Sequence, residues 1–174
     1  MMNRSRDAEA FCRRIRPRLV GSLVLFCNDA AVGEELAQEA LVRAMERWDR
    51  VGVYESPEAW VYRVGFNLAR SWLRRRIVQA RVQRQLVVDS CDRGGLPDTA
   101  TAIAVRDLVS RLPTRQRAVV IARFYVGLSV AETASVLNCA PGTITAHTHR
   151  ALARLRVDLE FDDTSKGARG SCQR

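Results

Sequence analysis

The side chains best suited to recognition chemistry lie near the C-terminal end of the chain, between residues 141 and 156. A helix starting at Pro141 would bury Ile144, Ala151, Leu152 and Leu155, which recur at helical spacing. Its outward positions carry hydroxyl, imidazole and guanidinium groups, which can hydrogen-bond to base edges and phosphates. The candidate DNA-contacting residues on this helix are Thr143, Thr145, Ala146, His147, His149, Arg150 and Arg154.

A shorter helix just before Pro141 would position this recognition surface. Ser129 and Glu132 have the spacing of a capping box, so a helix is expected to begin after Ser129. The segment 138–140 forms a brief turn, and Pro141 suits the first position of the second helix. Two helices joined by a tight turn are typical of a DNA-binding helix-turn-helix. The alternative is a helical hairpin inside an ordinary core.

The residue types that catalysis and metal binding require are scarce or scattered. His147 and His149, the only histidines, lie two residues apart on one helix and therefore point to different faces. The five cysteines show no paired C-x-x-C spacing, and Cys12, Cys27 and Cys139 are expected to act as small core residues. We therefore expect no catalytic residues, no metal site and no cofactor.

Composition points to a polyanionic partner. The chain of 174 residues has a formal net charge of +9, and Lys166 is the only lysine among its 28 basic residues. A basic balance of this size favours nucleic acid or an anionic membrane surface. No apolar run is long enough to span a bilayer, and the charged start lacks the apolar core of a signal peptide. Cytoplasm is the expected location.

The pattern along the chain predicts an all-α protein, made of two small helical domains joined by a flexible linker. The first domain covers residues 8–77 and the second, which contains the helix-turn-helix, covers residues 102–160. The linker, residues 78–101, contains the densest Gly, Pro and Asp patch, DSCDRGGLPDT. The polar tail, residues 161–174, is expected to be disordered.

An acidic stripe marks one helix of the first domain. Asn28 and Asp29 can cap a helix that begins near Ala30. Met45 and Trp48 are the last residues of its apolar stripe. The other side carries Glu35, Gln38, Glu39, Arg43 and Glu46. A solvated helix face is the ordinary alternative. DNA would repel these carboxylates, so a protein contact is the favoured interpretation.

An arginine stripe marks the next helix, which is expected to start at Ser56-Pro57. One side of this helix combines cations with an amide, at Arg63, Asn67, Arg70 and Arg74, and Arg75 follows directly. The aromatic residues Trp60, Phe66 and Trp72 interleave with them. This combination favours unstacked bases and backbone phosphates. The alternative is core aromatics beside a solvated face, and Trp60 and Trp72 individually are expected in the core.

Three motifs in order resemble the extracytoplasmic-function (ECF) group of bacterial RNA polymerase sigma factors, in their actinobacterial style. The motifs read EELAQEALVRAMERW, then PEAWVYRVGFNLARSWLRRR, then LPTRQRAVVIARFYVGLSVAETASVLNCAPGTITAHTHRALARLR. The resemblance covers about residues 8–160. The short linker lies where this group lacks the middle domain of larger sigma factors.

The resemblance implies a role for each stripe. Core RNA polymerase is the implied protein partner. The acidic stripe matches the segment that docks on the clamp helices of its largest subunit, and the flap of its second subunit is the other implied contact. Promoter DNA is the second partner, and an anti-sigma factor is left open as a third. The implied minus-ten residues are Tyr54, Arg63, Asn67, Arg70, Ser71, Arg74 and Arg75. The helix-turn-helix residues named above are the implied readers of the minus-thirty-five element.

The chain departs from the family pattern at two places. The family commonly has a basic residue, serine and arginine where this chain has Thr145, Ala146 and His147, and an apolar residue at Thr148. We therefore expect weaker or differently specified upstream binding, with thymine-methyl contacts available to Thr145 or Ala146. Ser71 replaces a more usual Asp or Asn, which affects minus-ten preference.

Three other functions compete with this interpretation. A free-standing repressor or activator would use the same helix-turn-helix, but it would not need the acidic stripe or the arginine stripe. An adaptor that binds only protein, for example one that sequesters polymerase, fits the unusual segment 145–148. An enzyme is disfavoured because no Ser/His/Asp set, phosphate loop or metal cluster is present in the sequence.

Overall fold

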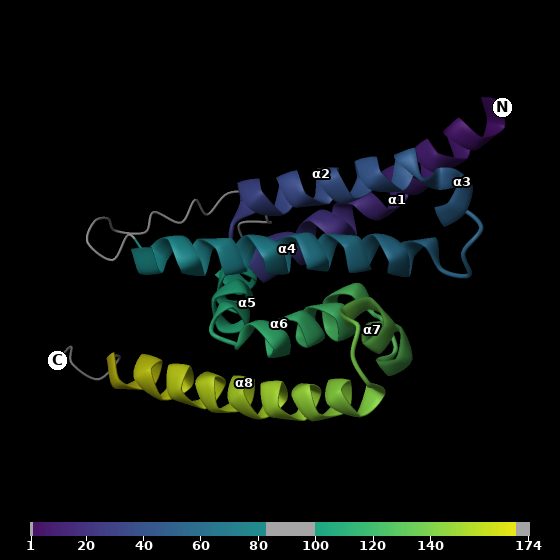
Figure 1. Cartoon of the computed structure of the whole chain (residues 1–174). Coiled ribbons are helices and arrows are strands. Elements are labelled where there is room, and N and C mark those ends of the chain that lie inside the picture. The colour runs from purple at the N-terminus through teal and green to yellow at the C-terminus, as the bar shows by residue number, and fades with distance from the viewer. Residues whose placement is uncertain (1, 83–99, 170–174) are drawn as a thin grey trace.

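The computed structural model describes the backbone of residues 2–82 and 100–169, and the side chains of residues 5–79 and 103–159. Within these ranges all regular elements are helices, so the predicted all-α class is confirmed (Figure 1). None of the helices in these ranges is long and apolar enough to cross a membrane.

Helices α1 (Met2–Cys27) and α2 (Ala30–Glu46) form the most closely packed pair. Asn28 adopts a left-handed conformation (φ 55°), and Asp29 accepts a hydrogen bond from the Val32 amide at 3.1 Å. The predicted start of α2 is thereby confirmed. Gly33 permits the close approach, because a Cβ at this position would lie 2.6 Å from the Val24 amide nitrogen.

The short α3 (Trp48–Val51) leads into the long α4 (Pro57–Val82), which completes the first lobe, α1–α4. Ser56 accepts a hydrogen bond from the Ala59 amide at 3.2 Å, which confirms the predicted start of α4. The rings of Phe26 and Phe66 meet edge to face in the core. The helix continues past the expected boundary at residue 77, because neither Gly nor Pro interrupts residues 77–82.

The second lobe consists of α5 (Ala100–Ser110), α6 (Thr114–Val120), the π-helix η1 (Ile121–Val126), α7 (Val130–Leu137) and α8 (Pro141–Arg169). The predicted capping box is present: Ser129 Oγ accepts from the Glu132 amide at 3.1 Å, and Glu132 Oε2 accepts from the Ser129 amide at 2.7 Å. Asn138 makes the turn with φ 53°. The backbone of α8 extends through residues 161–169, where a disordered tail was expected.

Two predictions of buried positions are wrong, one made from helical periodicity (Leu152) and one from cysteine usage (Cys139). Leu152 is 45% exposed, because Ile144, Ala151 and Leu155 form the packed side of α8 and Leu152 lies outside these packed clusters of the described residues. Cys139 is exposed because it lies in the turn between α7 and α8. Cys12 and Cys27 are buried as expected, and burial raises the pKa of the Cys27 thiol to about 12.

Other burial predictions are only partly met. Met45, expected on the apolar side of α2, is exposed, because the buried side of α2 runs through Leu41 and Ala44. Trp60 and Trp72 are half-buried against the core.

The two lobes lie directly against each other. Figure 1 shows α4 running along the second lobe, with α6 and α7 beneath it. One continuous cluster of buried apolar residues includes Phe66 and Leu23 from the first lobe and Val119, Val136 and Ile144 from the second. Each lobe therefore completes the burial of the other. The predicted linker lies mostly in residues 83–99, outside the described residues.

Candidate nucleic-acid interface

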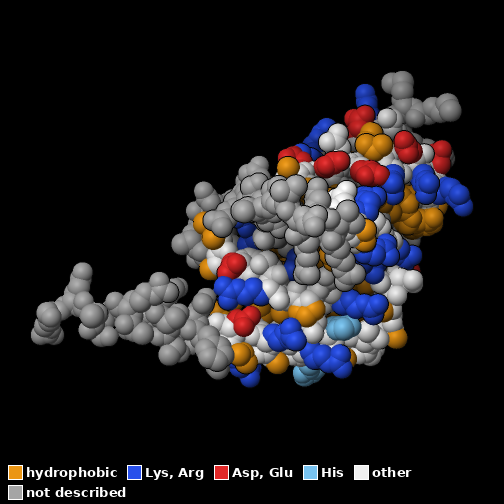
Figure 2. Space-filling view, turned by 60° about the vertical axis from the view of Figure 1, so that its left-hand side comes forward, with side chains coloured by type: hydrophobic (Ala, Val, Ile, Leu, Met, Phe, Trp, Pro, Cys, Tyr) orange, Lys and Arg blue, Asp and Glu red, His pale blue; other side chains and the backbone are white. Residues whose placement is uncertain are grey.

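The acidic stripe lies on the outer side of α2. Glu35, Gln38, Glu39 and Glu46 are exposed, while Leu36, Ala37, Ala40, Leu41 and Ala44 on the opposite side are buried. Arg43 donates to Glu39 Oε1 at 2.5 Å, one turn away. Several acidic side chains gather at the upper end of the face shown in Figure 2. The stripe is therefore available to a partner surface that carries cations.

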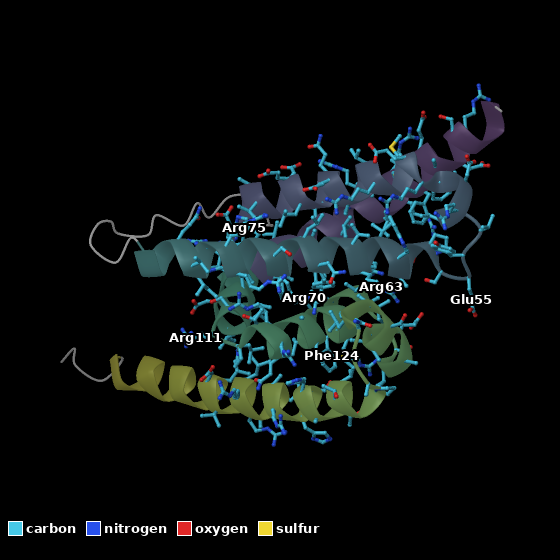
Figure 3. All side chains as sticks on the ribbon, in the orientation of Figure 1. Glu55, Arg63, Arg70, Arg75, Arg111 and Phe124 are labelled. Carbon is cyan, nitrogen blue, oxygen red and sulfur yellow. The ribbon has the colours of Figure 1, made fainter. Side chains whose placement is uncertain are left out.

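The arginine stripe lies on the side of α4 that faces the second lobe. Arg63 and Arg70 project toward α7, whereas Arg75 lies on the other side of α4 (Figure 3). Within the stripe, Arg70 donates to Asn67 Oδ1 at 2.5 Å and Arg74 donates to Ser71 Oγ at 3.1 Å. The structure therefore places five of the predicted minus-ten residues in one row on this side of α4 and places Arg75 apart from it. The row consists of Arg63, Asn67, Arg70, Ser71 and Arg74.

Two arginines of this row contact the second lobe. The Arg63 guanidinium donates to Ser135 Oγ at 2.7 Å, and that of Arg70 donates to the Leu137 carbonyl at 3.5 Å. Burial lowers the pKa of Arg70, and the nearby charges of Arg74 and Arg115 lower it further. Arg70 nevertheless stays cationic at neutral pH. Anionic phosphate would relieve this crowding of positive charge.

Two open clefts lie along the same side of α4. The first, of about 760 Å³, has Tyr54, Trp60 and Arg63 on one side and Ser135 of α7 on the other. The second, of about 520 Å³, has Asn67, Arg70, Ser71 and Arg74 facing Thr114 and Arg115 of α6. The exposed Tyr54 ring at the entrance of the first cleft could stack on an unpaired base.

The outer side of α8 carries most of the predicted upstream readers. Thr145, His149, Arg150 and Arg154 are exposed. Ala146 and Thr143 are half-buried beside them. This side of α8 can therefore enter a DNA groove with α7 packed behind it, as in other helix-turn-helix proteins.

His147 was predicted to point outward, and its half-buried position corrects that prediction. Its Nδ1 is buried without a hydrogen-bond partner, and its ring lines a cavity of about 110 Å³ together with Arg70, Arg115 and Cys139. Most of the cavity lining comes from α6 and from the turn between α7 and α8, so the packing of α6 on α8 within the second lobe half-covers this position. This could not be read from α8 alone.

Comparison with known families identifies both lobes. Residues 11–77 match the family described as Sigma-70 region 2, and residues 102–155 match Sigma-70, region 4. The chain is 33% identical over 157 residues to the RNA polymerase sigma-E factor of Streptomyces avermitilis, covering 90% of this chain and 87% of that protein. The chain belongs to the ECF sigma factors.

Other relatives support the same grouping. The ECF RNA polymerase sigma factor SigL of Mycobacterium tuberculosis is 31% identical over 145 residues, covering 76% of this chain and 77% of that protein. The fold resembles that of the sigma factor RpoE from Bartonella quintana, whose structure was solved in complex with the anti-sigma factor NepR. That match has a TM-score of 0.78 at 22% identity, over 90% of this chain and 98% of the other.

Family membership confirms the resemblance expected from the motifs. As a sigma factor, the protein is a transcription initiation factor that binds core RNA polymerase and promoter DNA. Region 2 corresponds to α1–α4 and region 4 to α5–α8. The free-standing regulator and the protein-only adaptor are therefore set aside.

Sequence reasoning missed the residues that join the two regions. Arg117 of α6 donates to the Phe26 carbonyl at the end of α1 at 2.9 Å, and Arg18 of α1 donates to the Val126 carbonyl at 3.5 Å. Tyr125 of η1 packs on Gly21 of α1. No local pattern marks these positions, because each partner lies in the other region.

Proposed function

We propose that this ECF sigma factor divides its work among three surfaces. The acidic stripe of α2 (Glu35, Gln38, Glu39, Arg43 and Glu46) docks on the clamp helices of the largest polymerase subunit. The row on α4, with Tyr54, takes up the unpaired strand of the minus-ten element. The outer side of α8 reads the minus-thirty-five element, and region 4 also meets the flap of the second subunit.

The observation that carries this proposal is the segregation of charge between α2 and α4. The two helices pack side by side in region 2, yet one presents carboxylates and the other guanidinium groups. A single polyanionic partner would be attracted to α4 and repelled by α2. Two different partners, one protein and one nucleic acid, fit both helices at once.

The proposed minus-ten role rests on three kinds of contact that the α4 row and its neighbours can make with an unpaired strand. Flipping a base out of the stack costs a few kcal/mol, which a shaped pocket must offset. Aromatic Tyr54 and Trp60, amide Asn67 and the arginines offer stacking, hydrogen bonding and phosphate contacts along one cleft wall. Ser71 accepts a hydrogen bond from Arg74. Its side chain offers only a hydroxyl group, where Asp or Asn is more usual in the family.

The upstream role differs from the usual family pattern. Arg150, Arg154 and His149 supply the polar readers. The Thr145 hydroxyl donates to the Pro141 carbonyl at 3.3 Å, and the exposed Thr145 side chain also offers a methyl group. With fewer phosphate-binding cations at the start of α8, specificity here depends more on Arg150. We further propose that the protein has no catalytic activity of its own and acts in the cytoplasm at the nucleoid.

The decisive experiment combines purified actinobacterial core RNA polymerase with this protein. A pull-down measures binding, and run-off transcription on a genomic promoter library identifies the promoters used. Stable binding with discrete new transcripts is the expected result. Binding without transcripts would contradict the proposed DNA roles, and absence of binding would contradict the proposed docking surface.

A further inference from the structure

A small cavity lies where α4 meets α6 and the turn between α7 and α8. Its volume is about 110 Å³, which is more than a single water molecule needs. The buried side chains of Ala118, Val119 and Leu137 form the apolar part of its lining. Asn138 and Cys139, which also line it, are exposed, so the cavity is open to solvent on one side. A small solute can therefore enter.

The charged groups that line the cavity are cations. Arg70 of α4 and Arg115 of α6 both contribute to it. Arg70 donates to the Asn67 side chain and to the Leu137 carbonyl, which are uncharged, and neither guanidinium pairs with a carboxylate among the described side chains. Burial lowers the pKa of Arg70, and the charges of Arg74 and Arg115 lower it further. An anion between the two guanidinium groups would replace this repulsion by attraction.

An unsatisfied imidazole nitrogen lies beside the same cavity. Nδ1 of His147 in α8 is buried, and it has no hydrogen-bond partner in the described part of the chain. A buried polar atom without a partner costs free energy, so a bound acceptor would stabilise the protein here. A neutral imidazole can carry its proton on Nδ1 and donate it. The ring therefore offers a donor to an oxygen atom in the cavity.

Two threonine hydroxyls add to the set of donors. Thr114 is the first residue of α6 and Thr143 lies in the first turn of α8, and both line the cavity. Together with the arginines and the imidazole, the donors come from α4, α6 and α8. Phosphate has four oxygens in a tetrahedral arrangement, so it can accept hydrogen bonds from several directions, and it matches the fork of a guanidinium. A planar carboxylate has two oxygens and would meet fewer of these donors.

We propose that this cavity binds a free phosphate ion, with Arg70 and Arg115 as its charged partners and Nδ1 of His147 as a further donor. The neighbouring clefts along α4, of about 760 and 520 Å³, are much larger. The small size of the cavity favours the free ion over a nucleotide chain with its sugars and bases. The inference does not depend on the roles proposed for α2, α4 and α8.

Calorimetric titration of the full chain with inorganic phosphate, at constant ionic strength, measures the affinity. Arg115→Ala and His147→Ala should each weaken phosphate binding about tenfold or more, because each removes a donor to a charged ligand. Arg156→Ala is the matched control, since Arg156 is an exposed arginine of α8 outside the cavity lining and its loss changes the net charge equally. Arg70 is left intact because it also belongs to the proposed minus-ten row.

The imidazole resonances locate the bound ion. The chain contains two histidines, His147 beside the cavity and His149 exposed on α8, and the signal lost in His147→Ala identifies the first. Phosphate should shift the ring resonances of His147 and leave those of His149 in place. Circular dichroism checks that each variant retains its helical content.

Three results would overturn the site. The first is the absence of phosphate binding to the unmodified chain, which would leave only water in the cavity. The second is an equal loss of affinity in Arg156→Ala and Arg115→Ala, which would indicate a general effect of charge. The third is that phosphate binds without shifting the His147 resonances, which would place the ion elsewhere.

A single-stranded oligonucleotide without terminal phosphates distinguishes the free ion from a DNA backbone. We expect it to leave the His147 resonances unchanged and not to compete with inorganic phosphate. Competition together with a shift of the His147 resonances would assign the cavity to the strand and overturn the free-ion site. Loss of polymerase binding or of promoter melting would count against the proposed function instead, and it would not affect these measurements.

Discussion

At the scale of single residues, the helix-turn-helix contains one polar side chain where an apolar one is usual. Thr148 is half-buried between Ile144 and Ala151, and its hydroxyl donates to the Ile144 carbonyl at 2.8 Å. The hydroxyl is therefore satisfied within its own helix and does not disrupt the packing of α8. The departure from the family pattern is compatible with the fold.

Ser129→Ala should destabilise the protein by about 1 kcal/mol at neutral pH, because it removes the N-cap of α7. Chemical denaturation measures the change, with Ser5→Ala, an exposed serine of α1, as control. An equal loss in both variants would contradict the capping role.

The same cap predicts a pH dependence. Hydrogen bonds from the Ser129 side chain and backbone lower the pKa of Glu132 below its usual 4.5. The stabilisation is therefore complete above that value and is lost as the pH falls through the lowered pKa. The stability difference between the unmodified chain and Ser129→Ala should narrow in acid, because the bond between the Ser129 side chain and the Glu132 carboxylate is lost on protonation, whereas the bond from the Glu132 amide to Ser129 Oγ remains; a constant difference would contradict the prediction.

Arg150→Ala should relax upstream base preference at one position by about 1–3 kcal/mol, because an exposed guanidinium on α8 would no longer read a base edge. Competition among randomised upstream sequences measures this effect. Arg156→Ala, an exposed arginine further along the same helix, should lower affinity without changing the preferred base. An unaltered binding profile for Arg150→Ala would refute the contact.

At the scale of elements, α2 and α4 show how neighbouring helices acquire different partners. Both bury one side in the same core, so packing alone does not distinguish them. Their outer sides differ in charge, and charge decides which macromolecule approaches. Substitutions on one helix can therefore change the binding of one partner without changing that of the other.

Glu39→Arg should weaken binding to core polymerase by more than about tenfold, since reversal places like charges across the proposed contact. Surface titration with immobilised core polymerase measures the affinity. Glu34→Arg is the matched control, because Glu34 is also exposed on α2 and pairs with Arg16 at 2.6 Å, but lies outside the stripe. Unchanged affinity in Glu39→Arg would rule out the docking assignment.

Arg63→Ala combined with Arg70→Ala should prevent open-complex formation while leaving polymerase binding intact. The double change removes two cations from the α4 row and leaves α2 unaltered. Permanganate footprinting of promoter melting, beside a polymerase pull-down, separates the two effects. Arg75→Ala tests the geometry, because this residue lies on the other side of α4 and should reduce melting less. Loss of polymerase binding would contradict the division of roles.

At the scale of the whole molecule, regions 2 and 4 share one apolar core. Buried residues from α1, α4, η1, α7 and α8 form a single contiguous cluster, so separating the regions exposes apolar surface on both. The free protein should therefore unfold in one cooperative transition.

Arg117→Ala should lower this cooperativity. The half-buried guanidinium donates to the carbonyls of Phe26, Ser110 and Leu112, and its loss leaves these acceptors without that charged donor. We expect destabilisation of about 1.5–3 kcal/mol and a broadened or split transition in calorimetry. Arg115→Ala, exposed on the same helix, should keep a single transition. A sharp single transition in Arg117→Ala would show that other contacts suffice.

The features that could be predicted from the sequence are local ones. The caps at Asp29, Ser56 and Ser129, the turn at Asn138 and the charge of the α2 and α4 faces all depend on residues within a few positions of one another. Hydrogen bonds of this range and helical periodicity are set by order along the chain. The same information, with the motif resemblance, was sufficient to identify the family.

The contact between the two regions could not be predicted from the sequence and depends on packing in three dimensions. Arg63 and Ser135 are separated by 72 positions, and the Gly21–Tyr125 approach likewise joins distant segments. The outward prediction for His147 and the buried prediction for Leu152 were wrong because each was judged on α8 alone. Whether a helix face meets solvent or another helix depends on shape and packing across the whole chain, which no local pattern encodes.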